Sequence, residues 1–167
     1  EMEKYVFLLK KNSLPWLWLS LLIVIADQLT KYWVVSHLDY QNPLHVLPFL
    51  NISLVYNTGV AFSFLSKAGG WQVYFFSVFA LMIALFFIRW LKRTSREFKW
   101  RGLALALIVG GALGNLIDRV RLHYVVDFAD FHVNSWHFAT FNVADSAISI
   151  GALLLILSFW YKPNHRL

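Results

Sequence analysis

The sequence predicts a mainly α-helical integral membrane protein, with four transmembrane helices and a small β-rich segment outside the bilayer. Of its 167 residues, 59% are hydrophobic and only 14% are charged, and the mean hydropathy is +0.56. In a soluble domain about a quarter of the residues are charged. Long apolar runs recur at roughly 14–35, 71–91, 102–117 and 144–161. At this length one membrane-embedded domain, residues 1–167, accounts for the chain.

The first predicted helix, 14–35, opens at Pro15, which suits a first helical turn because its missing N–H would be unpaired there. From Pro15 onward the run spans roughly 31 Å, enough to cross a bilayer core. Asp27 and Lys31 interrupt its second half four residues apart and share one helix face. Because pairing lowers the cost of burying either charge, we expect Asp27 and Lys31 to form a structural polar pair.

The segment 38–67 is predicted to be β-rich and to lie outside the bilayer. Pro43, Pro48 and Asn51 break up short pieces rich in β-forming residues, and no helical period fits them. The segment continues through Asn57 to Gly59, where the glycine is expected to supply a turn.

The second helix, 71–91, runs into a cluster of cations. The third, 102–117, contains small residues that allow a neighbouring helix to approach closely, and the fourth is 144–161. The cations at the end of the second helix and in its connection to the third are Arg89, Lys92, Arg93, Arg96, Lys99 and Arg101.

The distribution of lysine and arginine predicts the orientation. They concentrate in both tails and in the connection between the second and third helices, and the positive-inside rule makes these regions cytoplasmic. Both termini are therefore expected inside, with an outer loop at 118–143. The sequence pI of about 9.7 is explained by contact with anionic lipid, so we expect membrane lipid but no nucleic acid among the partners.

Several kinds of catalytic site are excluded by the residue types present. The chain has no cysteine, which rules out thiol nucleophiles and disulfides. It also has no Gly-x-Ser-x-Gly or His-Glu-x-x-His motif. The spacing of His123, His132 and His137 does not match common metal ligands. We therefore expect no metal and no cofactor.

Two aspartates remain as candidates for hydrolysis. Asp127 is flanked by Val126 and Phe128, and Asp145 heads the fourth apolar run. Two carboxyl groups a few Å apart cannot both ionise cheaply, so the pKa of one rises while that of the other falls. The charged carboxylate would take a proton from water, and the neutral one would hydrogen-bond the scissile carbonyl. The helix dipole favours Asp145 as the charged partner, and the apolar flanks favour Asp127 as the one with the raised pKa.

Structural roles for the same residues remain open at this level. Asn142-x-x-Asp145 is also a relative of the helix capping box, so Asp145 is equally explained as part of a cap. Asp127 can equally be a loop carboxylate that pairs with Arg119 or Arg121. Asp118 next to Arg119 favours a structural pair at a helix end, and Asp130 is expected to be solvated.

Five short blocks, in order along the chain, resemble those of one family. The chain is similar to the lipoprotein signal peptidases, or signal peptidases II, which are aspartic proteases of the bacterial inner membrane. The blocks are Asp27-Gln28-Leu29-Thr30-Lys31, Asn57-Thr58-Gly59-Val60-Ala61-Phe62, residues 110–119 (GGALGNLIDR), Val125-Val126-Asp127-Phe128 and Phe141-Asn142-Val143-Ala144-Asp145. Val60 departs slightly, since many relatives have alanine there.

The resemblance implies roles for individual residues. Asp127 and Asp145 would be the catalytic dyad, and Asp27 and Lys31 a pair needed for structural integrity. Residues that bind substrate or orient the dyad would be Asn57, Gly59, Asn115, Arg119 and Asn142. The family fold also implies a small extracytoplasmic β-cradle, near Leu44 to Tyr56, and a short extracytoplasmic helix, near Phe62 to Gly70.

The implied substrate is a prolipoprotein whose cysteine already bears diacylglycerol, cut on the N-terminal side of that cysteine. The enzyme would be a monomer in the bacterial cytoplasmic membrane, with its active site near the outer face. The alternatives are a small multi-pass transporter or ion-coupled carrier, which would need a polar track through the bilayer, and a structural assembly factor, in which isosteric replacement of either aspartate would be silent.

Overall fold

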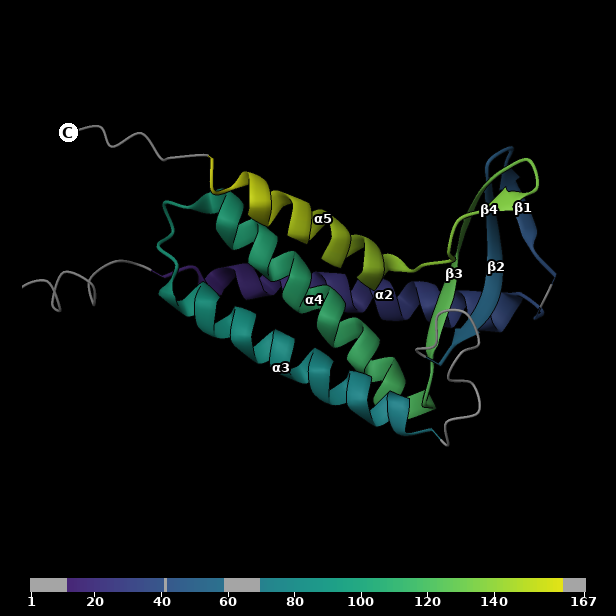
Figure 1. Ribbon diagram of the computed structural model, residues 1–167, viewed down its shortest axis with the longest axis horizontal. Helices are drawn as coiled ribbons and strands as arrows, with labels where there is room; N and C mark the ends of the chain where they lie inside the picture. The colour runs from purple at the N-terminus through teal and green to yellow at the C-terminus, as the bar shows by residue number, and fades with distance from the viewer. Residues whose placement is uncertain (1–11, 41, 59–69, 161–167) are drawn as a thin grey trace, which may run out of the picture.

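The computed structural model describes residues 12–40, 42–58 and 70–160. Most of this chain forms an elongated bundle of helices, and a small sheet stands at one end of the bundle (Figure 1). The helices are α2 (Leu17–His37), preceded by the 3-10 turn η1 (Leu14–Trp16), then α3 (Trp71–Arg93), α4 (Lys99–Leu122) and α5 (Val143–Leu157). The mainly helical architecture with a small sheet is thus confirmed.

Three of the helical segments are long and apolar enough to cross a membrane: Leu14–His37, Trp71–Arg93 and Lys99–Leu122. Helix α5 is apolar but has only 15 residues, or about 22 Å. Many large apolar side chains on α2 and α3 face outward, such as Leu22, which is 60% exposed, and Phe79, which is 49% exposed. Such surfaces are stable against lipid and not against water.

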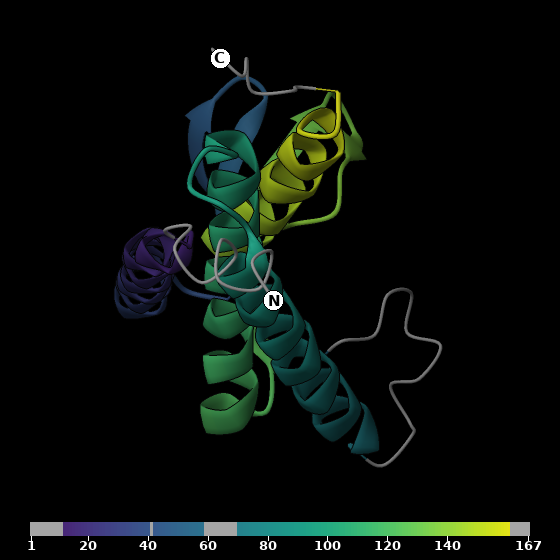
Figure 2. The same cartoon turned by 90° about the vertical axis from the view of Figure 1, so that its left-hand side faces the viewer.

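Helix α4 lies at the centre of the bundle and packs against α2, α3 and α5 (Figure 2). Its small residues make this possible. A Cβ on Gly110 would lie 2.9 Å from the carbonyl oxygen of Ser20 on α2, and one on Gly111 would collide with the carbonyl oxygen of Ala144 on α5. Glycine at these positions therefore lets both α2 and the first turn of α5 approach α4 closely.

The sheet has four antiparallel strands in the order β1 (Leu44–Leu47), β2 (Leu50–Asn57), β3 (Val125–Val133) and β4 (Trp136–His137). Its centre is the pairing of β2 with β3, in which Val55 lies opposite Asp127. Val126 on β3 packs with Leu54 on β2 and Val34 on α2, and this small core fixes the sheet against the end of α2.

The structure corrects two features expected from the sequence. The region 118–143 is not simply an outer loop, because α4 continues to Leu122 and β3 supplies a central strand of the sheet. The helix expected at 102–117 is longer at both ends, and the one expected at 144–161 spans Val143–Leu157. The turn expected at Gly59 and nearly all of the short outer helix expected near Phe62 to Gly70 lie outside the described residues.

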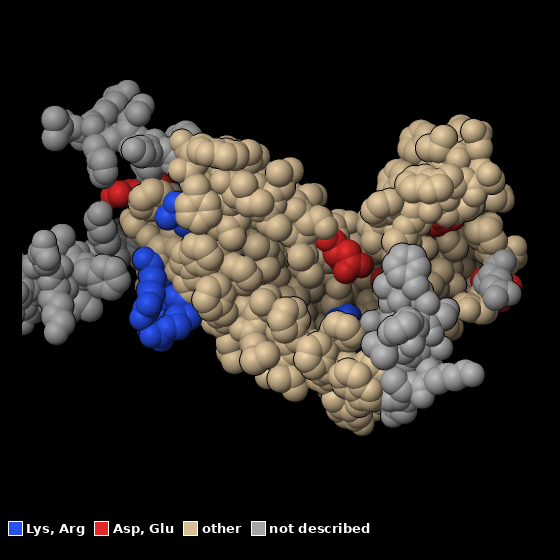
Figure 3. Space-filling view, in the orientation of Figure 1, with Lys and Arg blue, Asp and Glu red and all other residues tan. Residues whose placement is uncertain are grey.

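Charged side chains are unevenly distributed along the molecule. Most of the visible lysine and arginine lies at the end of the bundle remote from the sheet, beside a small acidic patch, and acidic side chains with one small basic patch lie at the hollow between the bundle and the sheet (Figure 3).

Candidate active site

Asp127 lies on β3, and its side chain is only 2% exposed. Each carboxylate oxygen accepts a hydrogen bond from an asparagine: Oδ2 from Asn57 Nδ2 at 2.9 Å, and Oδ1 from Asn142 Nδ2 at 2.7 Å. Asn57 ends β2, the neighbouring strand, and Asn142 immediately precedes α5. Two secondary-structure junctions thus converge on one buried carboxylate.

Asp145 lies in the first turn of α5, where it completes a capping box. Asn142 Oδ1 accepts the backbone N–H of Asp145 at 2.9 Å, and Asp145 Oδ2 accepts the backbone N–H of Asn142 at 3.2 Å. The other oxygen, Oδ1, accepts a hydrogen bond from Asn115 Nδ2 at 2.7 Å. The cap expected from the sequence is present, and it fixes the position of the carboxylate without occupying both of its oxygens.

Asn142 connects the two aspartates, because its amide oxygen caps the helix that begins with Asp145 while its amide nitrogen faces Asp127. This nitrogen also lies 3.1 Å from Asn115 Oδ1 and 3.2 Å from the Val126 carbonyl oxygen. The side chain is 1% exposed. A buried amide held on both ends can adopt one orientation only, so the two carboxyl groups are positioned by the same side chain.

Asn115, on α4, is oriented in turn by Lys31 on α2. Lys31 Nζ donates to Asn115 Oδ1 at 3.1 Å, which leaves Asn115 Nδ2 to face Asp145. Since Lys31 is an obligate donor, the amide of Asn115 cannot reverse without placing two donors against each other.

Beneath the two candidate aspartates lies a buried ionic cluster. Lys31 Nζ contacts Asp27 Oδ2 at 2.8 Å and Asp118 Oδ2 at 2.9 Å. Each aspartate also accepts a backbone N–H: Asp27 from Ala144 at 3.0 Å and Asp118 from Val126 at 3.1 Å. These amides belong to the residues immediately before Asp145 and Asp127. The cluster therefore ties both segments to α2 and α4.

The surroundings raise the pKa of Asp127 to about 6. Burial is the main cause, and the nearby charge of Asp145 adds to it, while the hydrogen bonds from Asn57 and Asn142 act in the opposite direction. This agrees with the expectation that Asp127 is the partner with the raised pKa.

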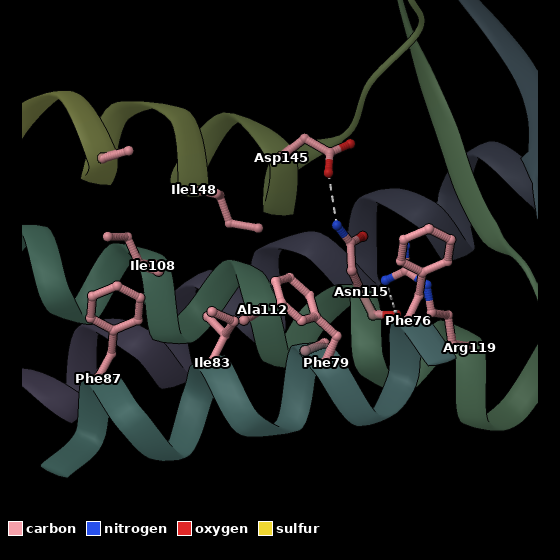
Figure 4. A pocket seen from close by; sticks show the side chains of 12 residues that line it. Phe76, Phe79, Ile83, Phe87, Ile108, Ala112, Asn115, Arg119, Asp145 and Ile148 are labelled. Atoms are coloured by element: carbon pink, nitrogen blue, oxygen red, sulfur yellow. Dashed lines mark hydrogen bonds between the residues drawn. The ribbon is translucent and has the colours of Figure 1, made fainter. Parts of the chain in front are cut away.

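A groove leads away from Asp145 along the bundle. It has a volume of about 440 Å³ and lies between α3, α4 and α5 (Figure 4). Asn115, Arg119 and Asp145 form one end, and the remaining lining is apolar and includes Phe79, Ile83, Phe87, Ile108 and Ile148. The guanidinium of Arg119 lies over the ring of Phe76, with its carbon 5.7 Å from the ring centre.

Of the residues singled out from the sequence, the structure brings together Asp127, Asp145, Asn57, Asn115 and Asn142. Arg119 lies at the same end of the groove, whereas Gly59 is outside the described residues.

Two expectations about neighbouring charges, and one alternative left open, need correction. Asp118 pairs with Lys31 rather than with Arg119. Asp127 bonds to asparagines and, among the described residues, forms no ion pair with an arginine. Asp130 is buried rather than solvated, since it is held by His137 at 2.9 Å and by Asn51 at 3.3 Å.

The sequence did not reveal the roles of Gln28 and Asp118 around this site. Gln28 Nε2 lies 2.8 Å from Asp118 Oδ1 and 3.2 Å from Asp27 Oδ2. Gln28 follows Asp27 directly, but nothing in a single sequence indicates that α4 lies beside this face of α2.

Chemically, the arrangement suits general acid–base hydrolysis. Asp145 lies at the polar end of an apolar groove, and Asp127, whose pKa is raised, is connected to it through Asn142. Neutral amide donors fix both carboxyl groups. Such a pair can hold one proton between two acids, which is the state that activates water and polarises a carbonyl.

Comparisons with known proteins show the family of the chain. The family model described as signal peptidase (SPase) II matches residues 19–161. A lipoprotein signal peptidase of Coxiella burnetii (strain Dugway 5J108-111) is 53% identical over 156 residues, covering 93% of this chain and 96% of that protein. One from Hydrogenovibrio crunogenus (strain DSM 25203 / XCL-2) is 48% identical over 159 residues, covering 95% and 92%.

A solved structure described as a bacterial membrane enzyme superposes with a TM-score of 0.75 at 30% identity, covering 92% of each chain. The fold and the sequence thus indicate the same family, and membership of it excludes the transporter and assembly-factor alternatives. The chain belongs to the signal peptidase II family.

Proposed function

We propose that this peptidase, which removes signal peptides from lipoproteins, uses Asp127 and Asp145 as its catalytic pair. The observation that supports this most strongly is the shared amide of Asn142, which donates to Asp127 Oδ1 at 2.7 Å and accepts from the backbone of Asp145 at 2.9 Å. One buried side chain therefore sets the separation of the two carboxyl groups.

In the proposed mechanism Asp127 begins protonated and Asp145 begins charged. Asp145 takes a proton from water, and the resulting hydroxide attacks the scissile carbonyl carbon. Asp127 donates its proton to the carbonyl oxygen, which gives a neutral tetrahedral diol. Asp145 then returns its proton to the leaving nitrogen as the C–N bond breaks, and Asp127 recovers a proton from the diol. Atoms and charges balance, and no covalent enzyme intermediate forms.

Two features support this division of roles. The raised pKa of about 6 favours a protonated Asp127. Asp145 lies in the first turn of α5, where the helix dipole stabilises an anion.

The substrate we propose is a prolipoprotein whose cysteine bears diacylglycerol, cut on the N-terminal side of that cysteine. The apolar groove between α3, α4 and α5 ends at Asn115, Arg119 and Asp145. An apolar signal segment or acyl chain can lie along it and place a peptide bond at the polar end. Arg119 and Asn115 are then suited to hold the substrate backbone.

We propose four membrane spans, with both termini cytoplasmic and the site near the outer face of the bacterial inner membrane. The cations gather at the end of the bundle opposite the sheet, as the positive-inside rule requires (Figure 3). Helix α5 is short, at about 22 Å, so its first turn and Asp145 would lie slightly below the outer interface. We further propose that the enzyme acts as a monomer, since one chain contains the whole candidate site.

The direct test is to incubate the purified full-length protein with a diacylglyceryl-modified precursor and with the same precursor lacking the lipid. We expect release of the signal peptide from the modified precursor alone. Equal cleavage of both precursors would contradict the proposed substrate, and cleavage of neither would contradict the proposed function.

A further inference from the structure

A second cavity lies at the opposite end of the bundle from the aspartates, where α3 connects to α4. It has a volume of about 630 Å³. Three arginines line it, Arg89 and Arg93 from the end of α3 and Arg101 from the start of α4. The aromatic side chains of Trp90 and Phe98 form part of its wall. The candidate active site uses none of these residues.

Arg101 is the arginine of this cavity that packs against aromatic rings. Its guanidinium carbon lies over two aromatic rings, 4.8 Å from the ring centre of Phe98 and 4.9 Å from that of Phe159. Its Nε is buried and has no hydrogen-bond partner among the described residues. A buried guanidinium N–H without an acceptor is costly, and a ligand with acceptor oxygens would satisfy it.

The cavity has no counter-charge of its own within the described residues. Its lining contains no carboxylate, and Glu97, the acidic residue of this connection, is not part of the lining. Helix α4 begins at the same place with no acidic residue in its first turn and no side-chain cap. The free N–H groups of that turn add to the positive potential. Three arginines and a helix start therefore favour an anion.

The position of the cavity relative to the membrane surface indicates which kind of anion it binds. Tryptophans at this end of the bundle are exposed: Trp18 by 72%, Trp100 by 50% and Trp160 by 76%. Tryptophan collects at the membrane–water interface, at the level of the lipid headgroups. The wall of the cavity also includes Phe86, which is 58% exposed on the outer surface of α3 and offers an apolar surface to acyl chains.

We propose that this cavity binds the phosphate of an anionic phospholipid headgroup, with Arg89, Arg93 and Arg101 as ligands. Arginine binds phosphate oxygens through two parallel N–H groups, which gives geometric as well as electrostatic selectivity. In the proposed orientation the lipid belongs to the cytoplasmic leaflet. The site is separate from the peptidase chemistry and does not depend on it.

The test is native mass spectrometry of the full-length protein in a neutral detergent, titrated with phosphatidylglycerol or with zwitterionic phosphatidylcholine. We expect one phosphatidylglycerol to be retained at least about tenfold more tightly than phosphatidylcholine, since one net charge interacts with three arginines. Replacing Arg89, Arg93 and Arg101 together by glutamine should weaken phosphatidylglycerol binding at least about tenfold.

The matched control replaces Lys92, Arg96 and Lys99 by glutamine, which removes the same charge from the same end of the bundle but outside the cavity lining. We expect less than about a threefold change, because these side chains offer only long-range attraction. Equal losses in the two triple variants would overturn the proposal, and so would equal binding of the two lipids.

Two further measurements test the lipid site, one without changing Arg101 and one by competition with free phosphate. Arg89 and Arg93 are exposed, so their double glutamine variant should fold even if loss of Arg101 destabilises the bundle, and it should still weaken binding several-fold. Inorganic phosphate in a hundredfold molar excess should not displace the lipid, since it lacks acyl chains. Displacement would show a free-phosphate site and contradict the lipid assignment.

Discussion

Replacing Asn142 tests the geometry of the site most sharply, because its amide has two separable functions. Its oxygen caps α5 by accepting the backbone N–H of Asp145, and its nitrogen donates to Asp127 at 2.7 Å. Asn142→Ser keeps a capping oxygen and removes the amide nitrogen that donates to Asp127. Asn142→Ala removes both.

The expected changes in the pKa of Asp127 and in Tm follow from these two contacts. A hydrogen bond to a charged group contributes about 1.5 to 3 kcal/mol, and about 1.4 kcal/mol corresponds to one pKa unit. Loss of the donor should therefore raise the pKa of Asp127 by roughly one to two units above its value of about 6. Loss of the cap costs about 1 kcal/mol, or a Tm decrease of roughly 2 to 4 °C for a chain of this size.

The assay is kcat/KM against pH with a lipid-modified precursor, together with thermal unfolding in detergent. If Asp127 acts protonated, the wild-type rate falls as pH rises through about 6. In both variants this decline should move to higher pH by about one to two units, and only Asn142→Ala should also lose Tm relative to Asn142→Ser. An unmoved or lowered midpoint would refute the role assigned to this amide.

Three other replacements test the supporting structure. Gly111→Ala should lower kcat/KM about a hundredfold, because the new methyl group pushes on Ala144 next to Asp145. Gly151→Ala, where α5 packs against α4 farther from Asp145, should lower Tm with less effect on rate. Lys31→Ala should destabilise the fold by about 3 to 5 kcal/mol, seen as a large loss of Tm, since it leaves two buried aspartates without their cation; an unchanged Tm with lost turnover would contradict its structural role. Ala152→Phe should fill part of the groove and raise KM severalfold with little change in Tm; an unchanged KM would show that substrate does not use the groove.

The helices were predictable because a long apolar run indicates a membrane helix without information from the rest of the chain. Pro15 indicates where the first helix begins, and the cations after 91 indicate where the second one ends. The glycines on α4 predicted a close helix contact, which the structure places against Ala144. These features are local, so one sequence suffices to find them.

The strand β3 was missed although its residues contain evidence for it. Val125, Val126 and Phe128 are β-forming, and Asn134 adopts a left-handed conformation with φ 54° in the tight turn to β4. The aspartates in this stretch favoured the prediction of a loop, because aspartate is uncommon in strands. Their burial is stable only because Asn57, Asn142 and His137 supply donors.

Partners from distant segments could not be predicted from a single sequence. The extension of α4 through Asp118 is stable because Lys31 of α2 neutralises the buried carboxylate, and neither residue indicates the other by spacing. The same is true of Asn115, whose orientation depends on Lys31. The resemblance to a family, rather than the physical pattern, singled out Asn115 and Asn57.

The central claim, that Asp127 and Asp145 perform the hydrolysis, is tested most directly by single-turnover cleavage of a diacylglyceryl-modified precursor with Asp127→Asn and Asp145→Asn. The control is Asp130→Asn, an aspartate on the same strand as Asp127 and also buried. We expect each dyad variant to lose at least about a thousandfold in rate while remaining folded, and the control to stay within about tenfold of wild type. A dyad variant that cleaves as fast as Asp130→Asn would contradict the account.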